Sequence, residues 1–487
     1  MIFYYFINTL IYAINKTIKQ LKKKNKIISI IGAGPAGLTA AYILTKNNIK
    51  VHLYESSNKV GGMCKTFQIW GQKVDLGPHR FFSNDLRVNR FWIKIMKNDY
   101  YMISRLTRIY YDKKFFFYPL KFFNVLNNLG LFKSFYCFSS FLYSKIFPPK
   151  NLNNFENWII AKFGKTLFNI FFKSYSEKLW GLKCNEIHSD FAKQRIKKLT
   201  LYEAIKGAIF KNNLKNHKTL VDEFAYPREG TGVFYEKIKQ EILRNGGKVF
   251  LNNKITKIKK SDREKKIIIK DQNNHTRKYN HMISTMPLNY LLENISAPNN
   301  ILKVSKTLKF RNTVLVYLLL NGQNPFPDQW IYIHSSNIKT GRITNFNNWS
   351  KKKNKKTKHT IICMEYWCNQ NDKMWNFKND DFIKLAKKDI KNSILLKNNK
   401  ILDGKVVKIP KCYPIYEKDY KRKIKIISNY LKKIKNISVI GRYGSFKYNN
   451  QDHSILMGLL AADNLINNKK INLWNLNTDY DYQEKSI

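Results

Sequence analysis

Apolar and polar positions along the chain follow two periods, which together predict an α/β protein. The run Ile27–Ile31 is continuously apolar and ends at a glycine, as expected of a strand buried on both faces of a parallel sheet. Ala36–Lys46 has the composition of a helix, and Val51–Tyr54 is the next apolar strand. These elements form a strand–helix–strand unit of about 30 residues, from which parallel sheets are built.

Helical periodicity dominates the second quarter of the chain, from Phe122 to about Phe210. One apolar face there, predicted to end near Gly181, contains Phe168, Phe171, Phe172, Tyr175 and Leu179. Strand patterns return between residues 247 and 367, and Ile437–Ile440 is a last strand before a helix over Gln451–Ile466. This order predicts a discontinuous nucleotide-binding domain with a helical insertion and a mixed β-sheet substrate domain.

The same patterns give approximate domain boundaries. The dinucleotide-binding domain is predicted to comprise residues 27–87, 215–300 and 435–468. The mainly helical insertion spans 88–214, and the mixed-sheet domain spans 301–434. Residues 1–26 form an apolar and then basic extension, and residues 469–487 form a tail.

A glycine-rich loop opens the first helix. It reads Gly32-Ala33-Gly34-Pro35-Ala36-Gly37, which fits the spacing GxGxxG. After a strand and before a helix, the first glycine permits a tight turn, the second lets a pyrophosphate approach the backbone, and the third lets helix and strand pack closely. Glu55 follows the second strand, where a carboxylate accepts both hydroxyls of a ribose. The combination predicts an adenine dinucleotide whose ribose lacks a 2′-phosphate.

The charge balance is strongly basic. The chain has 88 basic and 33 acidic residues, a net charge of +55. Such a field attracts nucleic acids, anionic membranes or anionic substrates. No single segment holds the excess and no nucleic-acid-binding module is found, so drift in composition is the simpler explanation and we expect no specific nucleic-acid partner. The six cysteines have no spacing that suits zinc, which predicts no metal site and a reduced, cytoplasmic protein with mostly buried thiols.

The N-terminal extension is apolar for about 14 residues and then basic. A membrane-spanning helix needs roughly 20 apolar residues, and a signal peptide has its charges before the apolar region. Two interpretations stay open. The extension is either an interfacial helix on the inner, anionic face of the membrane or a dispensable segment that packs on the fold.

Two further glycine elements refine the cofactor. The pair Gly61-Gly62 follows the acid, and a late strand ends at Gly441. The combination resembles the glutathione-reductase-like flavoprotein superfamily, which includes amine oxidases, protoporphyrinogen oxidases, phytoene desaturases and UDP-galactopyranose mutases. The resemblance implies a Rossmann-like domain of the glutathione-reductase type that binds FAD through Gly61, Gly62 and Gly441, with the adenine at the backbone of Ile255.

Within this superfamily the chain is most similar to the UDP-galactopyranose mutases, across most of its length. The similar segments are residues 77–85, 163–181, 226–232 and 441–452. The resemblance implies a uracil-binding patch of Tyr175, Ser176 and Trp180, a diphosphate site of Arg442 and Tyr448, and His79 beside the isoalloxazine. Arg342 is the candidate for a second arginine that the mutases carry on a mobile loop.

The residues themselves leave alternatives to these roles. Ser176 and Trp180 are four positions apart, so they share one helix face, where a Trp can stack on a base or can simply be a core aromatic. Arg442 is suited to clamp a diphosphate but also to form a surface ion pair. Tyr448 is either a phosphate ligand or a packing residue. His79 is either a catalytic residue at the cofactor, together with Arg442, or a structural histidine.

The chain departs from the mutases at three positions. Arg80 replaces an apolar residue, Phe82 replaces a second histidine, and Asn450 replaces an aspartate. By resemblance we predict an FAD-dependent enzyme that acts on a UDP-sugar through flavin N5, isomerises the ring and serves surface polysaccharide biosynthesis. The alternatives are hydride removal from a hydrophobic or amine substrate, and a non-enzymatic flavoprotein fold that binds nucleic acid or membrane. The oligomeric state stays open.

Overall fold

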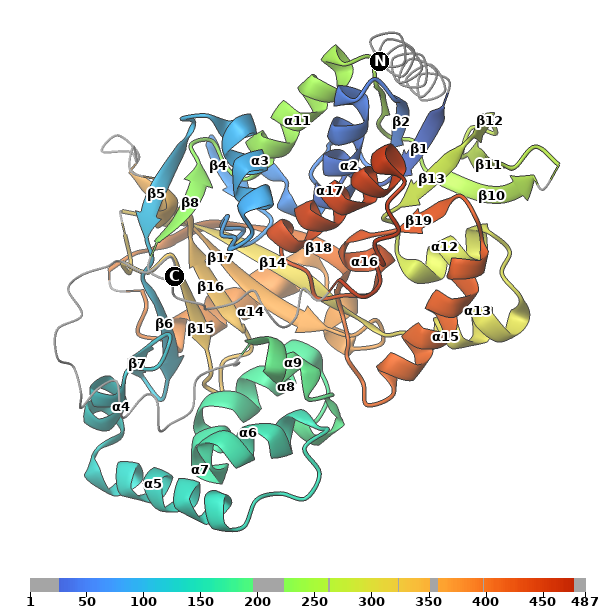
Figure 1. The fold of residues 1–487 in the computed structure, drawn as a ribbon. Helices are drawn as coiled ribbons and strands as arrows, with labels where there is room; N and C mark the ends of the chain where they lie inside the picture. Colours follow the sequence, from blue (N-terminus) through green and yellow to red (C-terminus); the bar gives the residue numbers. More distant parts are fainter. Residues whose placement is uncertain are drawn as a thin grey trace, which may run out of the picture.

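The computed structural model describes residues 26–195, 223–261, 263–322, 324–350, 358–396 and 398–476 (Figure 1). Residues 1–25 of the predicted extension, 196–214 of the predicted insertion, 215–222 of the predicted dinucleotide-binding domain and 477–487 of the predicted tail lie outside these ranges. Within the described ranges, no helix is both long enough and apolar enough to cross a membrane. The membrane contact and the cytoplasmic location stay predictions.

A five-stranded parallel sheet carries the first half of the fold. Its strands have the order β19-β13-β1-β2-β9. They are β1 (Ile27–Ile31), β2 (Lys50–Tyr54), β9 (Lys248–Phe250), β13 (His281–Ser284) and β19 (Ile437–Val439). Four of the five residues of β1 are buried, which explains its unbroken apolar run. Because neighbouring strands come from distant parts of the sequence, the predicted discontinuous α/β architecture is confirmed.

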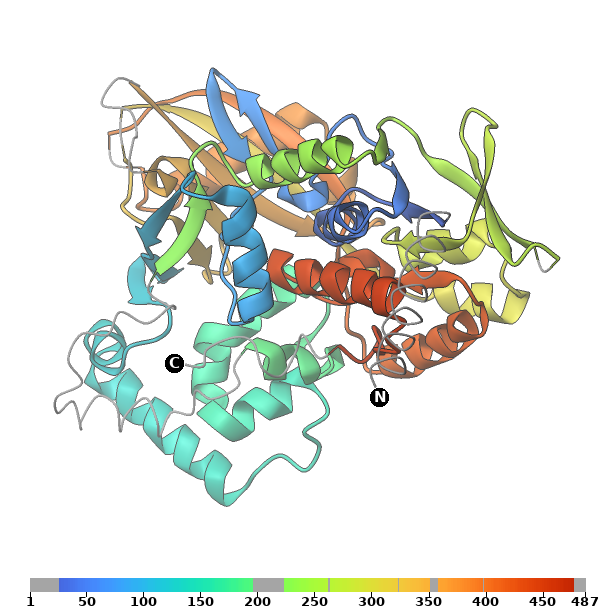
Figure 2. The ribbon, with the colours of Figure 1, turned by 45° about the horizontal axis from the view of Figure 1, so that its top comes forward.

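Three helices pack together beside this sheet. They are α2 (Pro35–Lys46), α11 (Gly232–Arg244) and α17 (Gln451–Asn467), and α2 contacts both of the others (Figure 2). The approach of α17 to α2 requires a glycine, since a Cβ atom at Gly458 would lie 2.5 Å from the carbonyl oxygen of Ala36. This packing fixes the helix that follows the glycine-rich loop.

A seven-stranded mixed sheet forms the second half. Its order is β18 (Ile401–Pro414), β14 (Phe310–Asn321), β17 (His359–Cys368), β16 (Arg342–Asn345), β15 (Trp330–Ile333), β6 (Thr107–Tyr111) and β7 (Lys114–Phe117). Only the β15–β6 pair is parallel. Helix α14 (Asn379–Lys391) buries Phe382 and Ile390 in one cluster with Val314 and Val316 of β14. The predicted mixed-sheet substrate region therefore has its own core.

The helical insertion lies at the far end of the molecule from α2 (Figure 1). It contains α4 (Phe122–Leu129), α5 (Leu131–Ile146), α6 (Phe155–Phe163), α7 (Lys165–Leu167), a π-helical segment Phe168–Lys173, α8 (Ser174–Trp180) and α9 (Asp190–Arg195). Helix α8 ends at Gly181, as predicted, with φ of 64°. It also contacts β17, so the insertion is tied to the mixed sheet.

Shorter elements connect these bodies. The helices are α3 (Leu86–Met96), α12 (Leu288–Asn294), α13 (Asn299–Lys306), α15 (Tyr420–Lys433) and α16 (Gly441–Gly444). The strands are β3 (Thr66–Ile69), β4 (Gln72–Asp75), β5 (Tyr100–Ser104), β8 (Glu223–Pro227), β10 (Ile255–Ser261), β11 (Lys266–Asp271) and β12 (Thr276–Tyr279). All six cysteines are buried and free, as predicted. The exact domain boundaries stay predictions.

Candidate active site

Four strands of the parallel sheet end at one cavity of about 910 Å³. Gly32 follows β1, Glu55 follows β2, Thr285 follows β13 and Gly441 follows β19, and all four line the cavity. The carboxyl ends of parallel strands are where α/β folds bind ligands. The cavity continues past this edge to residues of the mixed sheet, including Arg342 and Tyr413. We call the part of the cavity at the parallel sheet the dinucleotide end and the part at the mixed sheet the substrate end.

The glycine loops interlock at the dinucleotide end. Gly32 has φ of 96° and Gly62 has φ of 56°, both in the left-handed region that favours glycine. A Cβ atom at Gly62 would lie 3.0 Å from the Cα atom of Gly34, and Gly61 N donates to the carbonyl of Ala33 at 2.8 Å. The second glycine pair thus folds directly onto the first loop, which leaves bare backbone facing the cavity.

Two other predicted cofactor residues complete this end. Gly441 has φ of 83°, and a Cβ atom there would lie 3.3 Å from the Cβ atom of Ala36, at the start of α2. Pro35 is the first residue of α2. The helix N-terminus therefore faces the cavity with unpaired N–H groups, which suits a pyrophosphate. Gly37 packs α2 onto the loop, since a Cβ atom there would lie 2.0 Å from the Gly32 carbonyl oxygen.

The carboxylate of Glu55 is held in place by its own neighbours. Its Oε2 atom accepts from Ala33 N at 2.8 Å, and its Oε1 atom accepts from Ser57 N at 3.0 Å and from Ser57 Oγ at 2.6 Å. Ile255, the first residue of β10, lines the same cavity. A fixed carboxylate and an apolar residue in one cavity fit the ribose and adenine of a dinucleotide.

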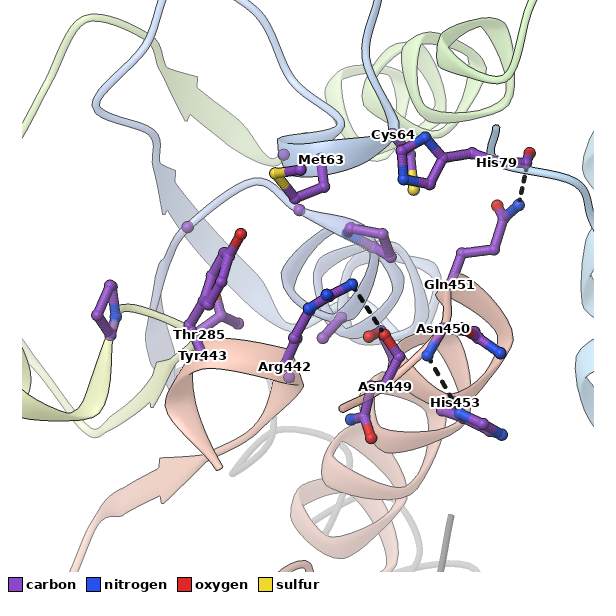
Figure 3. A pocket seen from close by; sticks show the side chains of 18 of the residues that line it. Met63, Cys64, His79, Thr285, Arg442, Tyr443, Asn449, Asn450, Gln451 and His453 are labelled. Atoms are coloured by element: carbon purple, nitrogen blue, oxygen red, sulfur yellow. Dashed lines mark hydrogen bonds between the residues drawn. The ribbon is translucent and has the colours of Figure 1, made fainter. Parts of the chain in front are cut away.

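His79 lies on the cavity wall (Figure 3). Its carbonyl oxygen accepts from Thr231 Oγ1 at 2.6 Å and from Gln451 Nε2 at 3.2 Å, so its backbone is fixed. Burial, with the positive charges of Arg342 and Arg442, lowers the pKa of the imidazole to about 3. Its Nδ1 atom is buried and has no hydrogen-bond partner within the described ranges. A neutral imidazole is thus available to bond a ligand but carries no charge at neutral pH.

Arg442 is a cation at the substrate end whose hydrogen-bond donors are only partly paired. Its guanidinium carbon lies 4.5 Å from the ring centroid of Tyr413 and 4.9 Å from that of Tyr448, and these rings stack at 5.4 Å. Nη1 donates to the carbonyl of Asn449 at 3.4 Å (Figure 3). Nε and Nη2 are buried and have no partner in the described part of the chain. Unsatisfied buried donors on a cation favour an anionic ligand.

The second predicted arginine has a fixed partner. Arg342 is the first residue of β16, and its Nε and Nη2 atoms donate to Oε1 and Oε2 of Glu365 on β17 at 2.6 and 2.7 Å. The position on a mobile loop expected by analogy is therefore wrong, because antiparallel pairing places Arg342 opposite Glu365. The side chain still lines the cavity. Its paired charge leaves Arg442 as the less satisfied of the two cations.

The three residues of the predicted uracil patch lie behind the cavity wall. Tyr175 stacks on His334 with centroids 4.7 Å apart, and Ser176 is buried. Trp180 is only 1% exposed and meets the ring of Tyr448 edge-on at 5.9 Å. None of the three is among the described residues that line the cavity, whereas Tyr448 is. Their role in base binding stays a prediction.

Several residues that shape the site were not predicted from the sequence. Gln451 donates to the carbonyls of His79 and Arg80 and accepts from Tyr235. Glu365 holds Arg342, and a single acid inside the apolar run of β17 was the available signal for a buried ion pair. No pattern in the sequence around Tyr413 marked it as a residue of the site. Within the described ranges, no cluster of His, Cys, Asp and Glu could hold a metal ion.

Solved structures share this fold across nearly the whole chain. A reduced UDP-galactopyranose mutase aligns with a TM-score of 0.82 at 21% identity, covering 93% of this chain and 96% of that one. A protein provisionally named protoporphyrinogen oxidase, from Exiguobacterium sp. 255-15, aligns with a TM-score of 0.70 at 13% identity, covering 91% and 99%. At these identities the likeness shows the fold alone.

Sequence comparisons place the chain among flavoproteins. Residues 30–95 match an NAD(P)-binding Rossmann-like domain. An L-amino-acid oxidase of Pseudechis australis is 34% identical over 119 residues, which are 21% of this chain and 23% of that protein. The chain thus matches less than a quarter of this curated relative. Residues 153–400, about half of the chain, match the flavin-containing amine oxidoreductases. The chain therefore belongs to the flavin-containing amine oxidoreductase family, and its cofactor is FAD.

Proposed function

We propose that this protein is an FAD enzyme that binds a nucleotide-diphosphate sugar, a UDP-sugar by its similarity to the mutases, and isomerises the sugar ring. The observation that carries the proposal is the guanidinium of Arg442, whose Nε and Nη2 atoms are buried in the cavity without a partner in the described residues. A diphosphate offers two adjacent anionic oxygens to such a fork of donors.

The charge of the cavity supports an anionic substrate. Four arginines line it, namely Arg80, Arg105, Arg342 and Arg442. Of these, Arg342 is paired with a carboxylate, while Arg442 is stacked on two tyrosine rings. Glu55, Glu293 and Asp452 also line the cavity, but the incompletely paired guanidinium of Arg442 favours a nucleotide diphosphate over a protonated amine at this end. The net charge of +55 adds to the same attraction.

Each residue then has a defined part in the reaction. FAD supplies the reactive ring atom, flavin N5 by analogy with the mutases. Arg442 holds the diphosphate and stabilises the charge that develops on it as a leaving group. Tyr413 and Tyr448 keep the guanidinium plane in one orientation. His79, neutral at physiological pH, bonds the cofactor or the sugar without adding charge. The isomerised sugar nucleotide would serve surface polysaccharide synthesis.

A second candidate function is oxidation of an amine or amino acid by hydride transfer to FAD. It is favoured by the family match over residues 153–400 and by the segment shared with an L-amino-acid oxidase. The aromatic stretch 115–123 would suit a hydrophobic substrate. The cationic cavity makes this the weaker candidate for an amine, but an amino acid also carries a carboxylate.

The test is a titration of the FAD-loaded protein, reduced with dithionite, with UDP and UDP-galactose while the flavin spectrum is recorded. We expect both ligands to perturb the spectrum and to compete. In Arg442→Leu the dissociation constant for UDP should rise about 10- to 100-fold while bound FAD is retained, because charge-assisted hydrogen bonds are lost. A wild-type protein that ignores UDP but is reduced by an amine or amino acid would replace this proposal with the second candidate.

A further inference from the structure

Arg80 is a cation held in a fixed position on the cavity wall. Its guanidinium carbon lies 5.4 Å from the ring centroid of Phe82 and 6.0 Å from that of Trp330. Its backbone carbonyl accepts from Gln451 Nε2 at 2.8 Å. Aromatic rings on the guanidinium and a tethered main chain together restrict the side chain to the cavity. Arg80 is thus placed as a ligand-binding group would be.

The guanidinium forms no ion pair in the part of the chain that the structure describes, although the carboxyl of Asp452 lines the same cavity and favours the charged form of Arg80. Its Nη1 atom is buried and makes no hydrogen bond there. Burial lowers the pKa of Arg80, and the positive charge of Arg105 lowers it further. Arg105 lines the same cavity, and its Nη2 atom donates to the carbonyl of Tyr118 at 3.4 Å. Two guanidinium groups with one nearby carboxylate leave an excess of positive charge in a partly dehydrated cavity, which an anion bound between the arginines would neutralise.

We propose that Arg80 and Arg105 form a second anion site, which binds a carboxylate on the sugar of the substrate. The parallel N–H donors of a guanidinium match the two oxygens of a carboxylate. This site is separate from the diphosphate site, because Arg80 lies over Phe82 and Trp330 whereas Arg442 lies over tyrosines. This inference rests on the proposed function. A carboxylate site beside the diphosphate site means that the substrate is a nucleotide-activated hexuronic acid.

The neighbours of Arg80 favour the sugar as the source of the carboxylate. Its guanidinium lies over the ring of Trp330 on β15 of the mixed sheet, at the substrate end of the cavity, whereas the residues of the predicted uracil patch do not line the described cavity. A group bound at Arg80 is therefore close to the sugar and not to the nucleotide base. A free amino acid would present the same carboxylate, so the experiment includes both sources.

The test compares UDP-glucuronate, UDP-glucose and L-phenylalanine as ligands of the FAD-loaded full-length chain. Flavin absorbance reports binding. We expect UDP-glucuronate to bind about 10- to 100-fold more tightly than UDP-glucose, as the gain of a charge-assisted bidentate contact implies. In Arg80→Leu this preference should disappear while UDP affinity and FAD content are unchanged. Arg80→Lys should keep part of it, because the charge remains but the planar fork is lost.

A matched control is Arg228→Leu, since Arg228 lies 4.9 Å from the ring of Tyr101 but does not line the cavity. It should leave every affinity unchanged. Equal affinity for the two sugar nucleotides, or a preference that survives Arg80→Leu, overturns the carboxylate site. If UDP does not bind at all but L-phenylalanine binds in an Arg80-dependent manner, the carboxylate site holds while the proposed function and the hexuronic acid fail.

Discussion

The two ends of the cavity are built by different means. At the dinucleotide end the main chain shapes the site, since Gly32, Gly62 and Gly441 have φ of 96°, 56° and 83° and bring separate loops into contact. At the substrate end, side chains from distant segments shape the site. Arg342 pairs with Glu365, 23 residues away, and Arg442 lies over rings that include Tyr413. The glycine loops of the first end leave no room for added side chains, whereas the second end is shaped by side chains.

This difference predicts different responses to substitution. A backbone site fails as a whole when a side chain is added, because no neighbour can move aside without disturbing the loop. A site made of side chains fails part by part, because each group contributes its own hydrogen bonds or packing. The largest effect should therefore be found at the dinucleotide end.

The largest effect is expected for Gly62→Val. The valine backbone would have to adopt φ of 56°, and the new Cβ atom would lie 3.0 Å from the Cα atom of Gly34. Strain and overlap at the pyrophosphate-facing loop should weaken FAD binding by on the order of 100-fold, so that the purified protein is colourless. Flavin absorbance per protein and calorimetric titration of FAD measure the loss.

Gly71→Val is the control that adds the strain of a positive φ without a steric overlap. Gly71 has φ of 73°, yet a Cβ atom there would meet nothing within 4 Å. This variant should unfold at a slightly lower temperature and still bind FAD normally. If both variants lose FAD alike, the glycine cradle is not what holds the cofactor.

The sequence predicted the dinucleotide end well because the determinants are local. Gly32, Gly34 and Gly37 lie within six positions, and Glu55 follows one strand later. Strand periodicity then placed β1, β2 and β19 with small errors at their ends. The substrate end could not be predicted in this way. The ion pair of Arg342 with Glu365 depends on β16–β17 register, and no local pattern marked Tyr413 as a neighbour of Arg442.

A buried carboxyl behind the substrate end should make stability depend on pH. Asp75 is fully buried and accepts from Tyr226 OH at 2.8 Å and from Thr231 N at 3.2 Å, and Thr231 in turn bonds His79. Burial raises the pKa of Asp75 to about 6. Between its unfolded pKa of about 4 and this value the native state binds one more proton than the unfolded state. Stability therefore falls as pH rises across this range.

The effect should amount to on the order of 2–3 kcal/mol, and Asp75→Asn should remove it. Urea unfolding of both proteins at pH 4.5, 5.5, 6.5 and 7.5 measures the difference in free energy of unfolding. We expect the wild type to lose stability relative to the variant up to about pH 6.5 and to run parallel with it above. Parallel curves over the whole range would mean that Asp75 is ionised throughout in the native state.

The smallest effect is expected for Trp180→Phe, and it decides what the helical insertion contributes. Trp180 is 1% exposed, and its Nε1 atom has no partner in the described residues, so Phe loses packing but no hydrogen bond. We expect the free energy of unfolding to fall by about 1–2 kcal/mol and UDP affinity to stay within about twofold. Trp349→Phe is the control for burial, since Trp349 is equally buried and also lies outside the cavity lining; it additionally loses the hydrogen bond from Nε1 to the carbonyl of Gln329 at 3.2 Å, so its stability should fall further while its UDP affinity is unchanged. If Trp180 instead stacks on the base, its replacement should weaken UDP binding by about 5- to 150-fold. That result would show that the wall of Tyr413 and Tyr448 opens when the nucleotide binds, and that the substrate end, unlike the dinucleotide end, takes its final shape around the ligand.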